Sequence, residues 1–375
     1  MADLPEVALV RDPGVLRGLV AQWEDLAQHA LEPNPLYEHW MLLPALAGTG
    51  DDFCCLLVRD GERLDGLFPL KRIQRLSGLP AGGYSSWCHS SWMLGTPLVR
   101  ATVAQSALAA ALDCLAHDGA AAVEFCHVPC DGPFHAALAD ALRERKATVV
   151  AIQSFTRGLL LKDASADAYI ESALSRESRK NLRRKEKRLG ERGAVAHVAL
   201  QPSDDVARWI EDFLRLEASG WKGKLGSALA CSQTGRRFAV EMLGAAFNRG
   251  RLQMIGLDVG GKPIARCCNL LAGEGSYAYR TAYDEDFAAY SPGIVAELDT
   301  VRAFHGDPRL QWMDSITDPD NGTINRLWKD RRTMQTLAVG ISTWGEAWIS
   351  MLPLMRWAKR RVTPPTPAVR LSATR

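Results

Sequence analysis

Two carboxylates and a tyrosine in the second half of the chain have the types and positions that group transfer requires. Glu217 lies one helical turn before a Gly-Trp-Lys-Gly motif, Asp314 ends a short predicted strand, and Tyr283 ends an aromatic strand. A carboxylate accepts the proton of an attacking amine, and a tyrosine hydroxyl donates a proton to a departing thiolate. These three residues are therefore predicted to be catalytic, the carboxylates as proton acceptors and the tyrosine as a proton donor. A helix-surface role for Glu217 and a loop-capping role for Asp314 are the alternatives.

Three neighbouring residues are predicted to bind substrate. Trp221 would form the wall of an acyl or acceptor pocket, with burial in the core as its alternative. Lys222 would pair with a phosphate or carboxylate, or else be solvated, and Asp284 follows Tyr283 at the end of the same strand. In the first half, the aromatic and hydroxyl-rich segment 82–92 is expected to help form an acceptor cleft between the two halves.

A phosphate site is predicted where a helix begins in the sequence Tyr290-Ser291-Pro292-Gly293. Proline suits the first turn of a helix because its missing N–H has no partner there. The free N–H groups and the helix dipole favour an anion, so Tyr290, Ser291 and Gly293 are predicted to bind the phosphates of a cofactor. The alternative is an ordinary capped helix.

A basic helix is predicted over residues 176–192, which hold nine basic and three acidic side chains. Arg183 and Arg184 in this helix are expected to contribute to cofactor binding. Such a concentration of charge suits phosphate groups or an anionic membrane surface. The alternative is a solvated helix face.

The elements that must position these residues form an α/β (α+β) pattern. A strand over 251–259 precedes Gly260-Gly261, which supplies the positive φ values of a two-residue hairpin loop. Two more strands follow this loop and complete a meander before the helix at Pro292. The first half contains a similar hairpin over 54–73, followed by alternating helices and strands. We therefore expect two tandem units with mixed, antiparallel-rich sheets flanked by helices. The predicted divisions are an N-terminal unit (1–165), a C-terminal transferase unit that includes the basic helix (166–342), and an amphipathic helix with a disordered tail (343–375).

The C-terminal helix is predicted to lie at a membrane interface. Trp344, Trp348 and Met355 recur at helical spacing, and Lys359-Arg360-Arg361 follow. Docking on the protein's own core is the alternative. Pro353 is expected to kink the helix.

Composition limits the remaining possibilities. The net charge is only +2, so a nucleic-acid partner is not expected. Nine scattered cysteines indicate reduced thiols in a cytoplasmic protein, and the single cluster Cys126–Cys130 does not supply a full set of zinc ligands, so no metal is expected. A secretory signal peptide is not expected either, because the N-terminus has no long apolar run.

Taken in order, several motifs resemble those of the CelD-type GNAT acyltransferases. They are Arg179-Lys180-Asn181-Leu182-Arg183-Arg184, the helix ending in Glu217-Ala218-Ser219-Gly220-Trp221-Lys222-Gly223, the meander, and Tyr290-Ser291-Pro292-Gly293. That family is related to the FemAB peptidyl-amine ligases, which carry two GNAT-like units. The sequence departs from the usual GNAT phosphate loop, of which only the last glycine and the helix start are kept.

The resemblance implies an acyl-CoA donor and an amine acceptor. We expect an N-acyltransferase that works peripherally at the inner membrane surface and acylates a long-chain sphingoid base, as bacterial ceramide synthases do. The alternative is acetylation of an amino sugar in exopolysaccharide or cellulose synthesis. Aminoacyl transfer from tRNA, or a GNAT scaffold that binds acyl-CoA or lipid without catalysis, would be further possibilities.

Overall fold

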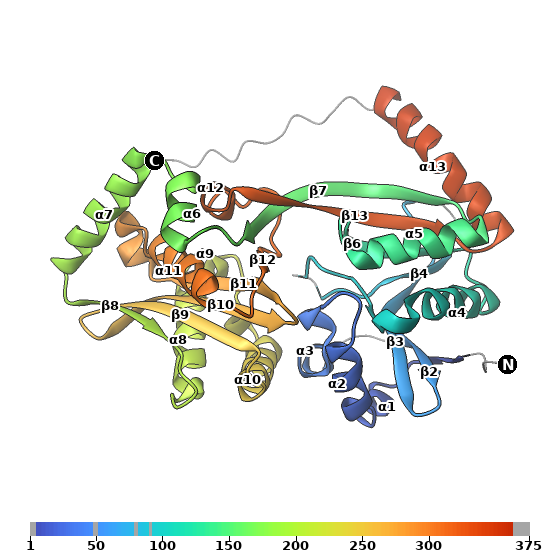
Figure 1. Cartoon of the computed structure of the whole chain (residues 1–375), viewed down its shortest axis with the longest axis horizontal. Helices are drawn as coiled ribbons and strands as arrows, with labels where there is room; N and C mark the ends of the chain where they lie inside the picture. The colour runs from blue at the N-terminus through green and yellow to red at the C-terminus, as the bar shows by residue number, and fades with distance from the viewer. Residues whose placement is uncertain (1–4, 48–51, 79–81, 90–91, 363–375) are drawn as a thin grey trace.

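The strands form one continuous mixed sheet that passes through both halves of the molecule (Figure 1). The computed structural model describes residues 5–47, 52–78, 82–89 and 92–362, and the side chains of Arg356 and of residues 358–362 lie outside that description. Along the sheet the order is β1-β2-β3-β4-β6-β13-β7-β12-β11-β10-β9-β8, and β5 pairs with β3. The expectation of an α/β protein with mixed sheets flanked by helices is confirmed.

The elements of the first half alternate in the predicted way. Its strands are β1 (Glu6–Val10), β2 (Phe53–Asp60), β3 (Arg63–Ile73), β4 (Gly83–Ser86), β5 (Leu98–Val99), β6 (Ala122–Pro129) and β7 (Val149–Leu161). Its helices are α1 (Pro13–Arg17), α2 (Val20–Gln28), α3 (His39–Ala45), α4 (Ala104–His117) and α5 (Pro133–Arg145), with short 3-10 turns η1 (Pro35–Tyr37) and η2 (Ala101–Val103).

The second half begins with α6 (Ala166–Ala173) and the basic helix α7 (Arg176–Gly190). Its strands are β8 (Val195–Ala199), β9 (Leu252–Val259), β10 (Lys262–Ala272), β11 (Gly275–Tyr283), β12 (Trp312–Asp314) and β13 (Asp330–Gly340). Its other helices are α8 (Val206–Ser219), α9 (Trp221–Lys224), α10 (Gln233–Asn248), α11 (Pro292–Gly306), α12 (Ile324–Leu327) and α13 (Thr343–Val362), with η3 (Leu229–Cys231) and η4 (Glu285–Tyr290). The predicted meander is β9–β10–β11, and Gly260 and Gly261 adopt φ values of 57° and 76° at its first turn.

The two halves repeat one topology and exchange their last strands. In each half four antiparallel strands are followed by a strand that pairs in parallel: β6 beside β4, and β12 beside β11. The long strands β7 and β13 then pair with each other, β13 also joins β6, and β7 joins β12 (Figure 1). The first half therefore contributes β7 to the strands of the second half, and the second half contributes β13 to those of the first. The division at residue 165 stays a prediction.

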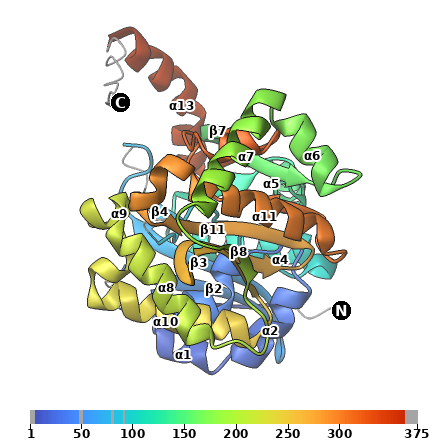
Figure 2. The ribbon, with the colours of Figure 1, turned by 90° about the vertical axis from the view of Figure 1, so that its left-hand side faces the viewer.

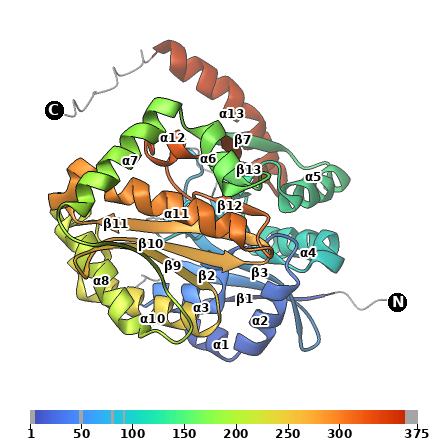
Figure 3. The ribbon, with the colours of Figure 1, turned by 60° about the vertical axis from the view of Figure 1, so that its left-hand side comes forward.

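Helices cover both faces of the sheet because alternate side chains along a strand point to opposite sides. In the second half, Cys268 on β10 packs with the cluster beneath α8 and α10, whereas its neighbour Cys267 packs with Val295 and Ala296 of α11. The two layers are visible on either side of the strands in Figures 2 and 3. The cluster beneath α8 and α10 continues into the first half, so the halves share a core.

The terminal helix α13 docks only in part. Ile349 and Leu352 are buried against Leu76 and Ala338, while Trp344 is 76% exposed and Leu354 is 63% exposed. Figure 1 shows the helix projecting beyond the sheet at the far end of β13. Docking on the protein's own core therefore holds for one face of α13, and the membrane interface stays a prediction for its exposed face. The predicted tail 363–375 and the side chains of Lys359, Arg360 and Arg361 lie outside the described residues.

Candidate active site

Two clefts meet above the end of the meander. The larger one, of about 1190 Å³, lies between residues 87–89 and 92–93 of the first half and α9, α10 and β11 of the second; we call it the large cleft. A second cleft of about 330 Å³ runs along β11 to the beginning of α11; we call it the strand cleft. The two share six residues, Trp221, Lys222, Tyr279, Arg280, Thr317 and Asn321. A molecule held in one cleft can therefore contact a molecule held in the other.

The strand that lines both clefts is irregular where they join. Cys268 and Asn269 on β10 pair with Arg280 and Ala278 on β11, so Tyr279 is an extra residue that forms a β-bulge. The other edge of β11 pairs with β12 only over Gly275–Tyr277. From Ala278 onward that edge has no described strand partner and borders the strand cleft.

The beginning of α11 closes the other end of the strand cleft. Ser291 precedes the helix with φ 56°, and Pro292 occupies its first turn as predicted. The Lys185 ammonium of α7 donates to the Ser291 hydroxyl at 2.7 Å. A side chain at Gly293 would place its Cβ 3.1 Å from the Tyr283 ring, so glycine keeps this end of the cleft open. The structure thus brings Ser291, Gly293 and Tyr283 together.

The predicted basic residues of α7 are only partly brought to the site. Lys185 and Arg326 border a cavity of about 640 Å³ that adjoins the strand cleft at Ser291. Arg183 and Arg184 are exposed and line none of these three cavities. Tyr290 is half-buried beneath the Arg188 guanidinium, which lies 5.8 Å from its ring centre.

Glu217 is buried and holds two cations at the junction of the clefts. Its Oε1 accepts hydrogen bonds from Arg280 at 2.6 Å and from Lys222 at 3.3 Å, and its Oε2 accepts one from the Leu229 N–H at 2.8 Å. Burial lowers the pKa of Lys222, and the neighbouring Arg280 lowers it further, whereas Glu217 opposes the shift. Both carboxylate oxygens are already used, so this geometry favours a positioning role for Glu217 over that of a base.

The other predicted residues divide between the site and its surroundings. Trp221 is 52% exposed and lines both clefts, so the alternative of a buried tryptophan is wrong, and its role in an acyl or acceptor pocket stays a prediction. Asp284 accepts from the Asp286 N–H and pairs with Lys262 at 2.8 Å, outside both clefts.

Asp314 is fully buried and also lies outside both clefts. It forms an ion pair with Arg157 at 2.6 Å, accepts from Arg332 at 3.2 Å, and accepts from the Ile316 N–H at 2.9 Å. Arg157 in turn donates to the carbonyl oxygen of Met93, a residue of the large cleft. Asp314 therefore connects β7, β12 and β13 behind the cleft, and both of its carboxylate oxygens accept hydrogen bonds.

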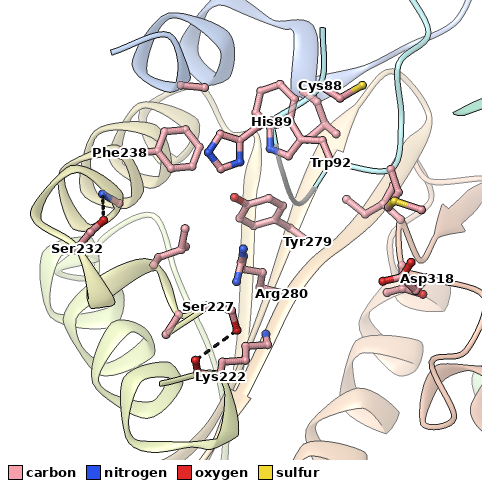
Figure 4. A pocket seen from close by; sticks show the side chains of 18 of the residues that line it. Cys88, His89, Trp92, Lys222, Ser227, Ser232, Phe238, Tyr279, Arg280 and Asp318 are labelled. Carbon is pink, nitrogen blue, oxygen red and sulfur yellow. Dashed lines mark hydrogen bonds between the residues drawn. The ribbon is translucent and has the colours of Figure 1, made fainter. Parts of the chain in front are cut away.

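The structure adds His89 and Tyr279, which the sequence argument did not single out. His89 stacks on Phe238 with ring centres 5.6 Å apart and lies above Tyr279 in the large cleft (Figure 4). Burial lowers the pKa of His89, and Arg280 lowers it further, so the imidazole is neutral at pH 7. Burial raises the pKa of Tyr279 to about 12. The only sequence signals were the aromatic segment 82–92 for His89 and the alternation of tyrosines in β11 for Tyr279.

A buried carboxyl group forms part of the strand cleft. Glu297 of α11 is buried, its Oε1 has no hydrogen-bond partner among the described residues, and the Cys267 thiol is 3.9 Å from its Oε2. Burial raises the pKa of Glu297 to about 7. Within the described residues, no group of three or more His, Cys, Asp or Glu side chains is arranged to hold a metal. No described helix has the length and apolar character needed to cross a bilayer.

Comparisons with solved structures show how this fold is shared. A conserved protein of unknown function from Bacteroides thetaiotaomicron superposes with a TM-score of 0.52 and 13% identity, over 86% of this chain and 97% of that one. FemX superposes with a TM-score of 0.52 and 10% identity, over 84% and 95% of the two chains. The C-terminal domain of a predicted lysylphosphatidylglycerol synthetase from Agrobacterium fabrum superposes with a TM-score of 0.52 and 10% identity, over 92% of this chain and 96% of that one. At these identities the likeness is one of fold.

The sequence itself matches one family model. No curated protein is significantly similar to the chain. Residues 176–321 match the acetyltransferase (GNAT) domain, and this stretch runs from the basic helix α7 to the loop that closes the strand cleft. It contains Glu217, Trp221, Lys222, Tyr279, Arg280 and the beginning of α11. Residues 176–321, in the second half of the chain, are therefore similar to the acetyltransferase (GNAT) domain.

Proposed function

We propose that the chain is an acyl-CoA-dependent N-acyltransferase that joins an acyl group to an amine held in the large cleft. The observation that carries this proposal is the meeting of the two clefts at the β11 bulge. One cleft leads from a helix N-terminus along an open strand edge, and the other leads from the opposite side to the same point. The GNAT match supports the assignment.

The strand cleft suits the donor by simple physical criteria. The N-terminus of α11, with the Gly293 N–H and nearby Lys185, favours the pyrophosphate. The open edge of β11 offers N–H and C=O groups to the amides of the pantetheine arm, much as an added strand would use them. Four residues of strand separate Tyr283 from Tyr279, or about 13 Å. The thioester would therefore reach the bulge.

The proposed reaction uses groups at that bulge. The amine nitrogen attacks the thioester carbonyl carbon, and the oxyanion is stabilised by backbone N–H groups beside Tyr279. Neutral His89 takes the proton from the attacking nitrogen. The carbon–sulfur bond then breaks, and a tyrosine hydroxyl protonates the thiolate. Tyr279 is better placed for this step than Tyr283, which packs beside Gly293 at the phosphate end.

The large cleft supports an amphipathic acceptor. Leu36, Trp87, Trp92, Phe238 and Ile316 form apolar parts of its wall. A long-chain sphingoid base would fill such a space, and the exposed face of α13 would hold the enzyme at the cytoplasmic side of the inner membrane. A polar rim, Ser227, Ser232, Thr234 and Asn321, favours the alternative, which is acetylation of an amino sugar.

The test is CoA release from acetyl- through palmitoyl-CoA with sphinganine and glucosamine as acceptors, and products identified by mass spectrometry. We expect amide formation that depends on both substrates and falls about a hundredfold or more in His89→Gln. The control is Val240→Ser, which changes an exposed position on α10 away from both clefts. Absence of CoA release with every amine, together with no acyl-CoA binding by calorimetry, would refute the proposal.

A further inference from the structure

The junction of the two clefts contains more positive than negative charge. The guanidinium of Arg280 and the ammonium of Lys222 share the single carboxylate of Glu217. We propose that Arg280 and Lys222 bind an anionic group of the acceptor, a carboxylate or a phosphate carried close to its amine. This inference rests on the proposed function and narrows its acceptor class.

Burial makes the charge balance significant. The side chain of Glu217 is inaccessible, that of Arg280 is 12% exposed, and that of Lys222 is 19% exposed. Within the described part of the chain, neither cation has a second carboxylate within 4 Å. Lys222 also donates to the Thr281 carbonyl oxygen at 3.3 Å, but this bond brings no charge. In a partly desolvated site that contains two cations and one anion, one more anion would neutralise the remaining positive charge.

The titration of the surrounding groups agrees with an excess of positive charge. Burial lowers the pKa of Lys222 on α9 and of His89 in the first half, and Arg280 lowers both further, while Glu217 opposes the shift of Lys222. Tyr279, the next residue on β11, remains protonated at neutral pH because burial raises its pKa to about 12. An incoming carboxylate or phosphate would relieve this repulsion and form charge-assisted hydrogen bonds.

The opposite wall has the complementary charge. Asp318 lies across the large cleft from Arg280 and Lys222 (Figure 4), and Asp320 also lines this cleft. Within the described residues, neither aspartate forms an ion pair. They would attract the ammonium form of an acceptor before it loses its proton. Cations on one side and carboxylates on the other match a molecule that carries both charges. Amino acids, aminoalkyl phosphates and phosphorylated sphingoid bases share this chemistry, whereas sphinganine and glucosamine lack the anion.

The experiment compares acceptors in pairs that differ by one negative charge. The pairs are leucine and leucinamide, phosphoethanolamine and ethanolamine, and sphinganine 1-phosphate and sphinganine, each with a saturating acyl-CoA. We expect the wild type to prefer the charged member, and the pair with the largest preference identifies the source of the anion. In Lys222→Met, kcat/KM for that member should fall about tenfold to a hundredfold, because a hydrogen bond to a charged group is lost.

The controls separate this role from others. With Lys222→Met, the rate with the charged member should fall more than the rate with the uncharged member, and the KM for acyl-CoA should change less than the KM for the charged acceptor. Lys224→Met, which removes an exposed lysine on the same helix outside both clefts, should behave as the wild type. The double variant Glu217→Gln/Arg280→Gln removes both members of the shorter ion pair. It should keep its fold by circular dichroism and should also lose the preference.

Three results would overturn the inference. Equal use of charged and uncharged acceptors by the wild type would show that no anion is recognised. An equal loss with both members of a pair would assign Lys222 to the reaction itself, and a raised KM for acyl-CoA would assign it to the donor. Each of these still involves CoA release with an amine, so the proposed N-acyltransferase would stand. No CoA release with any amine would refute the proposed function instead.

Discussion

Asp314→Ala should destabilise the protein by about 3–5 kcal/mol, the usual cost of removing one partner from a buried ion pair. The carboxylate and the Arg157 side chain are both inaccessible and lie 2.6 Å apart, so the variant leaves a buried guanidinium without its counter-charge. The Ile316 N–H also loses its acceptor. Against a typical total of about 5–15 kcal/mol, this loss removes about a fifth or more of the stability.

The assay is urea denaturation followed by circular dichroism and tryptophan fluorescence. Asp60→Ala is the matched control, because it breaks an exposed pair with Arg63 at 2.9 Å and should cost less than about 1 kcal/mol. The double variant Arg157→Leu/Asp314→Leu removes both buried charges, so it should recover most of the stability that Asp314→Ala loses. Arg332 keeps Asp131 as a neighbour in that variant.

Activity of the double variant decides between a bracing and a catalytic Asp314. The double variant also removes the hydrogen bond from Arg157 to the Met93 carbonyl oxygen at the cleft. Some loss of kcat, of no more than about tenfold, is therefore expected even if Asp314 has only a structural role. A stable double variant with a thousandfold lower kcat would restore Asp314 as a catalytic residue. A cost below about 1 kcal/mol for Asp314→Ala would refute the stability argument.

Three further predictions follow from the same geometry. The kcat/KM of the wild type should rise with pH with a midpoint below pH 6.5, because burial lowers the pKa of His89 and its neutral form is the base. The His89→Gln variant should lose that rise. Burial raises the pKa of Glu297 from 4.5 to about 7, so wild-type stability falls as pH rises through this window, where the unfolded chain ionises first. In urea denaturation, the free energy of unfolding of Glu297→Gln relative to wild type should therefore rise by about 3 kcal/mol between pH 4.5 and pH 8. The same difference between the two proteins at both pH values would show that Glu297 is not buried in its neutral form. A smaller fraction of the double variant Trp344→Ser/Leu354→Ser should sediment with phosphatidylglycerol vesicles, whereas Val240→Ser should behave as the wild type. Equal binding by the wild type and both variants would exclude α13 as the membrane contact.

Local patterns in the sequence determined the elements of the second half. Gly260-Gly261 specifies the tight turn between two apolar strands, and Pro292 specifies the beginning of α11, because both depend on backbone properties of single residues. The meander, the basic helix and the phosphate-site candidates Ser291 and Gly293 could therefore be predicted. Trp221 and Lys222 were also placed correctly beside a pocket, since they follow directly from the end of α8.

Tertiary structure alone decided how those elements combine. The exchange of β7 and β13 between the halves depends on pairing between strands more than 160 residues apart, which no local pattern encodes. That arrangement buries Asp314 against Arg157, and the shared core brings His89 of the first half to Arg280 of the second. Whether a carboxylate is a base or a brace depends on its partners and its burial. Both are properties of long-range contacts, so residue type and spacing left the choice open.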